Sequence, residues 1–109
     1  MKLNFKDKKI RELCEKKSVA DKKLGAICAR KLRARLDDLD AASKVTGLTA
    51  GNPHPLKADR LGQFALDLAG GWRLVFAPDH DPLPVRDDQS IDWSQVTIVS
   101  IEFIGDYHD

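Results

Sequence analysis

The last four residues, Asp106-Tyr107-His108-Asp109, bring a carboxylate, a phenol and an imidazole together. They follow the apolar run 96–104, which predicts a buried strand. Groups that exchange protons, held at the end of a strand, resemble parts of an acid–base site. A polar tail that keeps the chain soluble is the alternative, and these four residues alone favour it. The choice between an acid–base site and a polar tail therefore depends on residues in other segments of the chain.

A second imidazole lies in the segment 53–60, where prolines flank His54 on both sides. The two prolines restrict the backbone around the ring, so His54 stands on a stiff loop. Histidine changes its charge near neutral pH, which suits proton transfer. Lys57 and Arg60 add positive charge nearby. An ordinary surface loop with rigid turns is the alternative interpretation.

Arg73 is a candidate for binding an anion. It follows Trp72 at the start of an apolar segment, and neighbouring side chains of a strand point to opposite faces. If Trp72 packs under helices, Arg73 projects from the open face of the sheet. The planar guanidinium group matches the oxygens of a phosphate. A solvated strand arginine is the alternative.

The elements that would position these groups are helices in the first part of the chain and strands in the second. Apolar residues three and four positions apart predict two helices, at 7–17 and 20–42. Apolar runs and alternating patterns predict strands at 3–5, 62–68, 72–76 and 96–104. We therefore expect a single α+β domain over 1–109, with two N-terminal helices packed on a small antiparallel sheet.

Two long connections complete this organisation. A loop rich in glycine, proline and threonine runs from 43 to 61 and carries His54. An acidic excursion with several prolines runs from 78 to 93, and within it His80 lies between two aspartates. Three consecutive residues rarely wrap one metal ion, so we expect no metal site there.

The composition excludes several classes of protein. The 109 residues are 42% hydrophobic and 32% charged, which is typical of one globular domain rather than a disordered chain. No apolar stretch has the roughly 20 residues of a membrane span, and residues 1–6 lack the apolar segment of a signal peptide. We expect a cytoplasmic protein. Cys14 and Cys28 have no metal-type spacing and are interpreted as reduced core thiols.

The near-neutral net charge hides an asymmetry. Residues 1–36 hold 13 lysines and arginines against 4 acidic residues, whereas residues 37–109 hold 5 against 13. A basic half suits a polyanion such as RNA, or an acidic protein partner. The alternative is that lysine and arginine are abundant there because they favour helix.

Three motifs in this order resemble a known family. They are His-Pro-Leu-Lys-x-Asp-Arg at 54–60, x-Gly-x-Trp-Arg-Leu-x-Phe at 69–76 and the C-terminal Asp-Tyr-His at 106–108. With the preceding helices, they are similar to the HigB-type killer-protein branch of the RelE/ParE toxin superfamily. The resemblance extends from about residue 5 to residue 108.

The resemblance implies the RelE-like microbial ribonuclease fold and cleavage of mRNA in the ribosomal A site, which inhibits translation. It implies no metal and no organic cofactor. The implied partners are the ribosome with its mRNA, and a HigA-like antitoxin with a helix-turn-helix module. Operator DNA would be bound only through that antitoxin.

The resemblance also implies roles for individual residues. The catalytic set would be His54, Arg73, Asp106, Tyr107 and His108. The RNA-binding set would be Lys57 and Arg60 near the site, with Lys22, Lys23, Arg30 and Arg33 on the basic helices. A histidine suits the base that takes the 2′-hydroxyl proton or the acid that protonates the leaving oxygen, and the sequence leaves open which histidine does which.

Two other functions stay open at this point. One is a ParE-like toxin that inhibits DNA gyrase by binding, although such chains generally lack a histidine-bearing tail. The other is a binding module without catalysis, which acts as a co-repressor beside its antitoxin. The excursion at 78–93 is longer than the hairpin typical of the family, and its role is likewise open.

Overall fold

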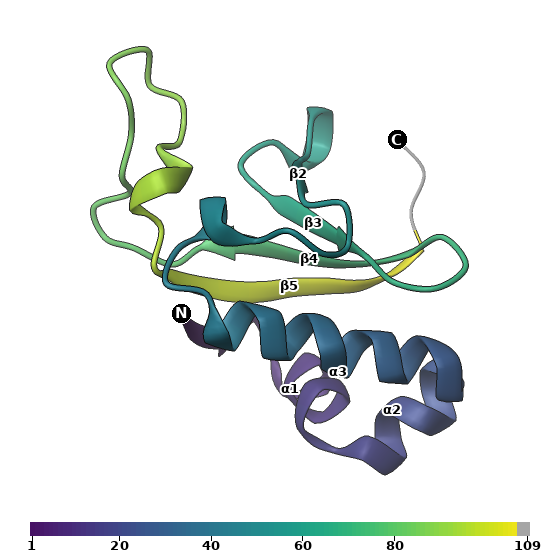
Figure 1. The fold of residues 1–109 in the computed structure, drawn as a ribbon. Helices are drawn as coiled ribbons and strands as arrows, with labels where there is room; N and C mark the ends of the chain where they lie inside the picture. The colour runs from purple at the N-terminus through teal and green to yellow at the C-terminus, as the bar shows by residue number, and fades with distance from the viewer. Residues whose placement is uncertain (107–109) are drawn as a thin grey trace.

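A layer of three helices covers one face of a five-stranded sheet in the computed structural model, which describes residues 1–106 (Figure 1). The helices are α1 (Lys8–Glu15), α2 (Lys17–Leu24) and α3 (Ala26–Ala41). The strands are β1 (Lys2–Phe5), β2 (His54–Pro55), β3 (Phe64–Asp67), β4 (Trp72–Pro78) and β5 (Ile98–Asp106). Short 3₁₀ helices lie at Val45–Gly47, Ala58–Arg60 and Trp93–Gln95. The α+β class is confirmed.

The helical layer differs from the prediction in the number of helices. The predicted helix at 20–42 is interrupted at Gly25, whose φ of 81° lies in a region that glycine adopts at little cost. α2 therefore ends there and α3 begins at the next residue. The first helix is shorter than predicted and begins after Asp7, whose carboxylate accepts a hydrogen bond from the Ile10 N–H at 2.9 Å.

The sheet is mixed rather than purely antiparallel. Its strand order is β1-β5-β4-β3-β2, and β1 runs parallel to β5 while the other neighbours are antiparallel. The predicted edge strand near residue 3 is present as β1. The parallel pairing follows from the chain path, because the three helices separate β1 from the remaining strands.

The core fills the space between the sheet and the helices. Its members are large side chains with almost no exposed surface, among them Leu32, Leu39, Leu74, Phe76 and Ile101. A smaller cluster of Leu56, Ala65 and Val75, with Phe103 packed against it, lies apart from this core. Figure 1 shows β2 and the neighbouring 3₁₀ helix on the side of the sheet away from the helices. We call this side the open face.

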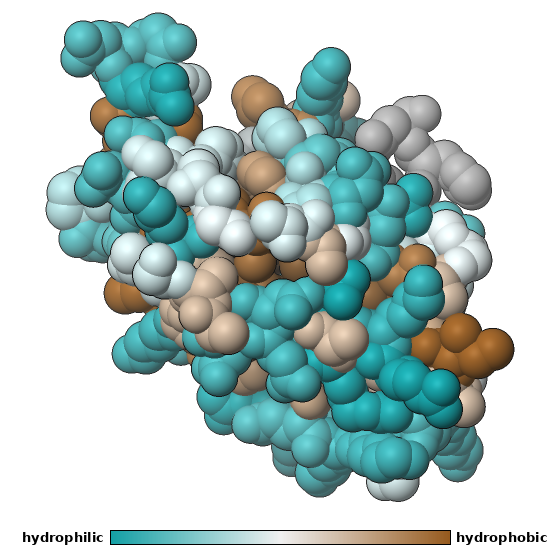
Figure 2. Space-filling view, in the orientation of Figure 1, coloured by the Kyte–Doolittle hydropathy of each residue, from teal (hydrophilic) through white to brown (hydrophobic). Residues whose placement is uncertain are grey.

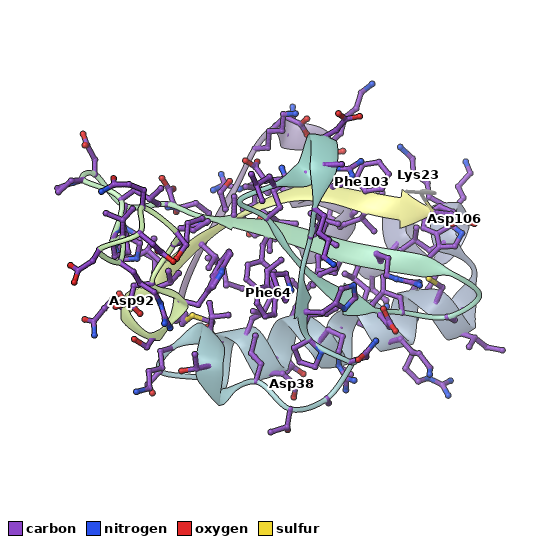
Figure 3. All side chains as sticks on the ribbon, turned by 90° about the horizontal axis from the view of Figure 1, so that it is seen from above. Lys23, Asp38, Phe64, Asp92, Phe103 and Asp106 are labelled. Atoms are coloured by element: carbon purple, nitrogen blue, oxygen red, sulfur yellow. The ribbon has the colours of Figure 1, made fainter. Side chains whose placement is uncertain are left out.

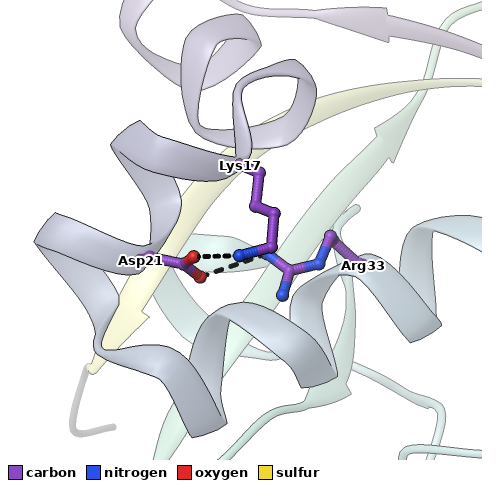
Figure 4. Close-up of polar contacts among 3 residues, drawn as sticks. All are labelled: Lys17, Asp21 and Arg33. Carbon is purple, nitrogen blue, oxygen red and sulfur yellow. Dashed lines mark hydrogen bonds and ion pairs between the residues drawn. The ribbon is translucent and has the colours of Figure 1, made fainter.

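One carboxylate links two of the helices. Asp21 of α2 lies 2.6 Å from the Lys17 ammonium group and 3.3 Å from the Arg33 guanidinium group of α3 (Figure 4). The hydrogen bond from Lys17, followed by that from Arg33, lowers the pKa of Asp21. Among residues 1–106, none of the helices combines the length and the apolarity that crossing a bilayer requires.

Cys14 gives a test of the packing beneath α1. Burial, and then the neighbouring Glu15 carboxylate, raises the pKa of its thiol from 9.0 to about 12. The thiolate is the reactive form, so we expect alkylation by iodoacetamide at about pH 8 to be at least roughly 100-fold slower in the folded protein than in urea. The folded state binds this proton more tightly than the unfolded state does. The free energy of unfolding should therefore fall as the pH rises from 9.0 towards about 12. Mass spectrometry of the labelled peptide measures the rate, and equal rates in both states would contradict the buried position.

Candidate functional site

The strand register places His54 and Arg73 on the same face of the sheet. His54 pairs with Ala65, which in turn pairs with Val75, and the next-but-one position of β4 is Arg73. Paired residues and next-but-one neighbours project from one face. Trp72 packs against the helix-side core, as predicted, so Arg73 belongs to the open face. The two most chemically suggestive residues of the central sequence therefore share one surface.

The imidazole of His54 has a defined orientation. Its Nδ1 lies 2.7 Å from the backbone oxygen of Asn52. A carbonyl oxygen only accepts hydrogen bonds, so Nδ1 carries the proton in this contact. In the neutral ring, Nε2 then has a free lone pair. This is the form of histidine that takes a proton from a substrate.

The guanidinium group of Arg73 is held by a carboxylate across the hairpin. Its Nε lies 2.8 Å from Oδ1 of Asp67, and both side chains are about one-third exposed. Nη1 of Arg73 donates to the Trp72 carbonyl oxygen at 3.3 Å. The Asn52 side chain donates to the other Asp67 oxygen at 3.4 Å. Asn52 thus contacts His54 through its backbone and the Asp67–Arg73 pair through its amide.

A second cation, Arg60, lies on the same side of the sheet. The Arg60 guanidinium carbon lies 4.4 Å from the centre of the Phe103 ring, and Nη1 donates to the Gln63 amide oxygen at 3.4 Å. The Phe103 ring in turn lies across Gly105 of the same strand, where an added Cβ would come within 2.7 Å of the ring. Lys57 is exposed and immediately precedes the 3₁₀ helix Ala58–Arg60, to which Arg60 belongs.

Comparison with known proteins places this geometry in context. No family model and no curated protein matches the sequence. Two similar solved structures are a YoeB/ParE toxin from Agrobacterium tumefaciens, with 13% identity and a TM-score of 0.62, and a YoeB–YefM complex from Staphylococcus aureus, with 15% identity and a TM-score of 0.60. The alignments cover 99% and 100% of this chain and 100% and 98% of those chains. A YoeB dimer from Staphylococcus aureus gives 16% identity and a TM-score of 0.58, covering 100% of this chain and 98% of that one.

The chain has the fold of YoeB- and ParE-type toxins. The RelE-like fold expected from the sequence motifs is therefore confirmed. The assignment to the HigB branch and the roles of the individual residues stay predictions.

Asp106, one of the C-terminal candidates, is the last residue of β5. Asp106 is exposed and pairs with Trp72, so the ladder places it on the face opposite to Arg73. Figure 3 shows Phe103 and Asp106 towards this end of the sheet and Asp92 at the other end. Tyr107 and His108 lie outside the described residues. Of the predicted catalytic set, the structure therefore brings together His54 and Arg73.

The basic residues predicted to bind RNA divide between two faces. Lys57 and Arg60 lie on the open face with His54, whereas Lys22, Lys23 and Arg30 are exposed on the helical layer. Arg33 belongs to the helical layer too, but its guanidinium group is paired with Asp21. A single-stranded RNA bound to the open face would contact only Lys57 and Arg60. The cations of the helical layer are suited to bind a second, larger polyanion.

The imidazole of His80 has a structural role, in that it joins two segments of the backbone. Its Nε2 accepts hydrogen bonds from the Thr97 and Ile98 N–H groups, at 3.1 and 3.2 Å. These contacts fix the start of the acidic excursion to the start of β5. Over residues 1–106, no group of three histidine, cysteine or acidic side chains is arranged to hold a metal ion.

Gly105 gives a test of the packing beneath Arg60. A methyl group at this position would lie 2.7 and 3.0 Å from atoms of the Phe103 ring. We expect Gly105→Ala to lower the free energy of unfolding by about 1–3 kcal/mol, since overpacking forces neighbours out of their preferred positions. Urea denaturation measures the change. Gly47→Ala is the matched control, because nothing lies within 4 Å of a Cβ there. Equal stability of the two variants would contradict the packing of Phe103 over the strand.

Proposed function

We propose that this chain is the toxin of a toxin–antitoxin pair and that it cleaves mRNA on the ribosome. The observation that carries the proposal is the placement of His54 and Arg73 on one face of a sheet with a toxin-like fold, with the Nε2 of His54 available to take a proton. A binding module or a gyrase inhibitor has no need of this arrangement.

The chemistry follows from RNA itself. The ribose 2′-hydroxyl attacks the adjacent phosphate, the bond to the 5′-oxygen breaks, and a 2′,3′-cyclic phosphate remains. His54 takes the proton from the 2′-hydroxyl as the general base. Arg73 stabilises the negative charge that builds up on the phosphate oxygens. His108 protonates the departing 5′-oxygen in this scheme, so the proton removed at one oxygen is matched by one delivered at the other.

The network around Arg73 supports this role. The Nε contact with Asp67 orients the guanidinium group on the open face, and Asn52 connects the same carboxylate to the loop that carries His54. Orientation before substrate arrives lowers the cost of reaching the transition state. Neither Asn52 nor Asp67 belongs to the predicted site, and we assign both as positioning residues.

The partners follow from the same proposal. One structural relative is a YoeB–YefM complex, and we infer that an antitoxin likewise covers this chain. We propose the HigA-like type, in which a helix-turn-helix module of the antitoxin contacts operator DNA. The exposed cations Lys22, Lys23 and Arg30 on the helical layer would contact ribosomal RNA, while the open face receives the mRNA.

Induced expression in a bacterial host tests the function. We expect growth arrest together with new mRNA 5′ ends at codon-spaced positions, mapped by primer extension. Purified gyrase should keep its supercoiling activity in the presence of the protein. Arrest with intact mRNA and inhibited gyrase would instead establish the ParE-like alternative, and normal growth with intact mRNA would favour a binding module.

A further inference from the structure

A groove separates the acidic excursion from the segment that covers the open face. It is lined by residues 55–56 and 61–63 from one segment, and by residue 86, residues 88–91 and Trp93 from the other. Its volume is about 720 Å³, which lies in the range of recognition sites. The excursion is the feature of the sequence that the proposed function leaves unused.

The walls of the groove are held in place by the rest of the fold. Trp93 meets Phe64 edge to face at 4.9 Å, and Phe64 stacks on the fully buried Phe76 at 5.6 Å. At the tip, the Arg86 N–H donates to the Ser90 carbonyl at 2.8 Å, and Asp88 accepts from the Ser90 N–H at 3.0 Å. The groove is therefore formed before any partner arrives, which lowers the entropic cost of binding.

Exposed aliphatic side chains gather beside this groove. Leu61 on one wall is 80% exposed, and Leu83 and Val85 on the excursion are 42% and 46% exposed. Val85 pairs with Ile91, which lines the other wall. Figure 2 shows hydrophobic side chains below the hydrophilic tip of the excursion and on the segment facing it. Aliphatic side chains in such a position suit apolar side chains of another protein.

The charge of the excursion narrows the chemistry of the partner. Residues 79–92 contain five aspartates and one arginine. The hydrogen bonds from Ser90 lower the pKa of Asp88, so this carboxylate stays ionised at neutral pH. A negative rim repels the phosphates of a nucleic acid and attracts lysine and arginine side chains.

We propose that this groove binds a segment of a partner protein in which large apolar side chains are flanked by lysine or arginine. The apolar side chains pack against Leu61 and Trp93, and the basic side chains pair with Asp88, the aspartate of the excursion that lines the groove. Pro55 of the groove follows His54 in β2, so the groove and the candidate site share this strand. The proposal does not depend on the proposed function, since it rests only on the shape, exposure and charge of this surface.

Binding of three labelled probes to the purified protein tests the proposed groove. The probes are a short peptide of alternating lysine and leucine, the same peptide with glutamate in place of lysine, and a single-stranded RNA of equal length. Fluorescence anisotropy should show binding of the lysine–leucine peptide at least about tenfold tighter than that of the glutamate–leucine peptide. Leu61→Ser should weaken the binding of the lysine–leucine peptide by about tenfold, the loss expected for one buried aliphatic side chain.

Ile27→Ser is the matched control, because Ile27 is 71% exposed on α3 and does not line the groove. It should leave the binding of the lysine–leucine peptide unchanged. Equal binding of both peptides, or equal losses in the two serine variants, would overturn the proposal. RNA that binds with an affinity dependent on Leu61 would also overturn it, in favour of a nucleic-acid site. None of these outcomes requires that the chain be toxic.

Discussion

We expect His54→Ala, Arg73→Ala and His108→Ala each to lower the rate of mRNA cleavage on ribosomes by roughly 10²–10⁴-fold. Positioned acid–base groups contribute about this much to a rate, and removal of one group that stabilises developing charge costs about 10²–10³-fold. The losses should be in the rate of the chemical step, measured in single turnover with the protein in excess over the ribosomes. Growth arrest on induction should disappear in parallel.

The same variants should fold normally. Arg73 is 30% exposed on the open face, and His54 is half-buried at the sheet edge, so neither truncation opens a cavity in the main core. Circular dichroism and the urea midpoint test this. Arg11→Ala is the control for loss of a cation, because Arg11 pairs with Glu15 on the helical layer. Cleavage at the unmodified rate by the folded His54 and Arg73 variants would contradict the proposed chemistry.

The strand part of the fold was predictable because its signals are local. The alternation at 62–68, the glycine turn and the return from Trp72 form one hairpin, and its register follows from the short turn. The opposite orientations of Trp72 and Arg73 follow from the two-residue period alone. The side of the sheet that carries Arg73 was thus readable from sequence, whereas His54 was predicted in a loop and instead lies in β2, paired with Ala65 of the hairpin.

The helical layer shows where periodicity fails. The apolar stripe of Leu24, Cys28 and Leu32 continues across Gly25 with helical spacing, so it gave no sign of a break. A glycine within a helix costs only about 1 kcal/mol, which makes an uninterrupted helix a reasonable prediction. Gly25 instead ends α2 with a φ of 81°, a conformation that glycine adopts at little cost at a helix end.

Two residues of the site, Asp67 and Asn52, were not predicted from the sequence, for different reasons. Asp67 faces Arg73 across the hairpin, and the turn length alone would have identified this pair. Asn52 is different, since its contacts with His54 and Asp67 depend on the course of a long loop. The parallel pairing of β1 with β5 is also nonlocal, because it joins the two ends of the chain. No short-range signal in the sequence specifies the contact of Asn52 with Asp67 or the pairing of β1 with β5.

The last expectation concerns the substrate. We expect mRNA bound in a translating ribosome to be cleaved at least about 10³-fold faster than the same RNA in solution, because holding reactants in line is worth several kcal/mol. On the open face, His54 and Arg73 supply a base and a cation from partly exposed positions. The ribosome would supply the in-line geometry, and the basic helical layer would hold the toxin there. Primer extension with the two forms of RNA measures the ratio, with folded His54→Ala as the background. Equal cleavage of free RNA would show that the chain positions its own substrate, and the ribosome-dependent part of the proposal would then be wrong.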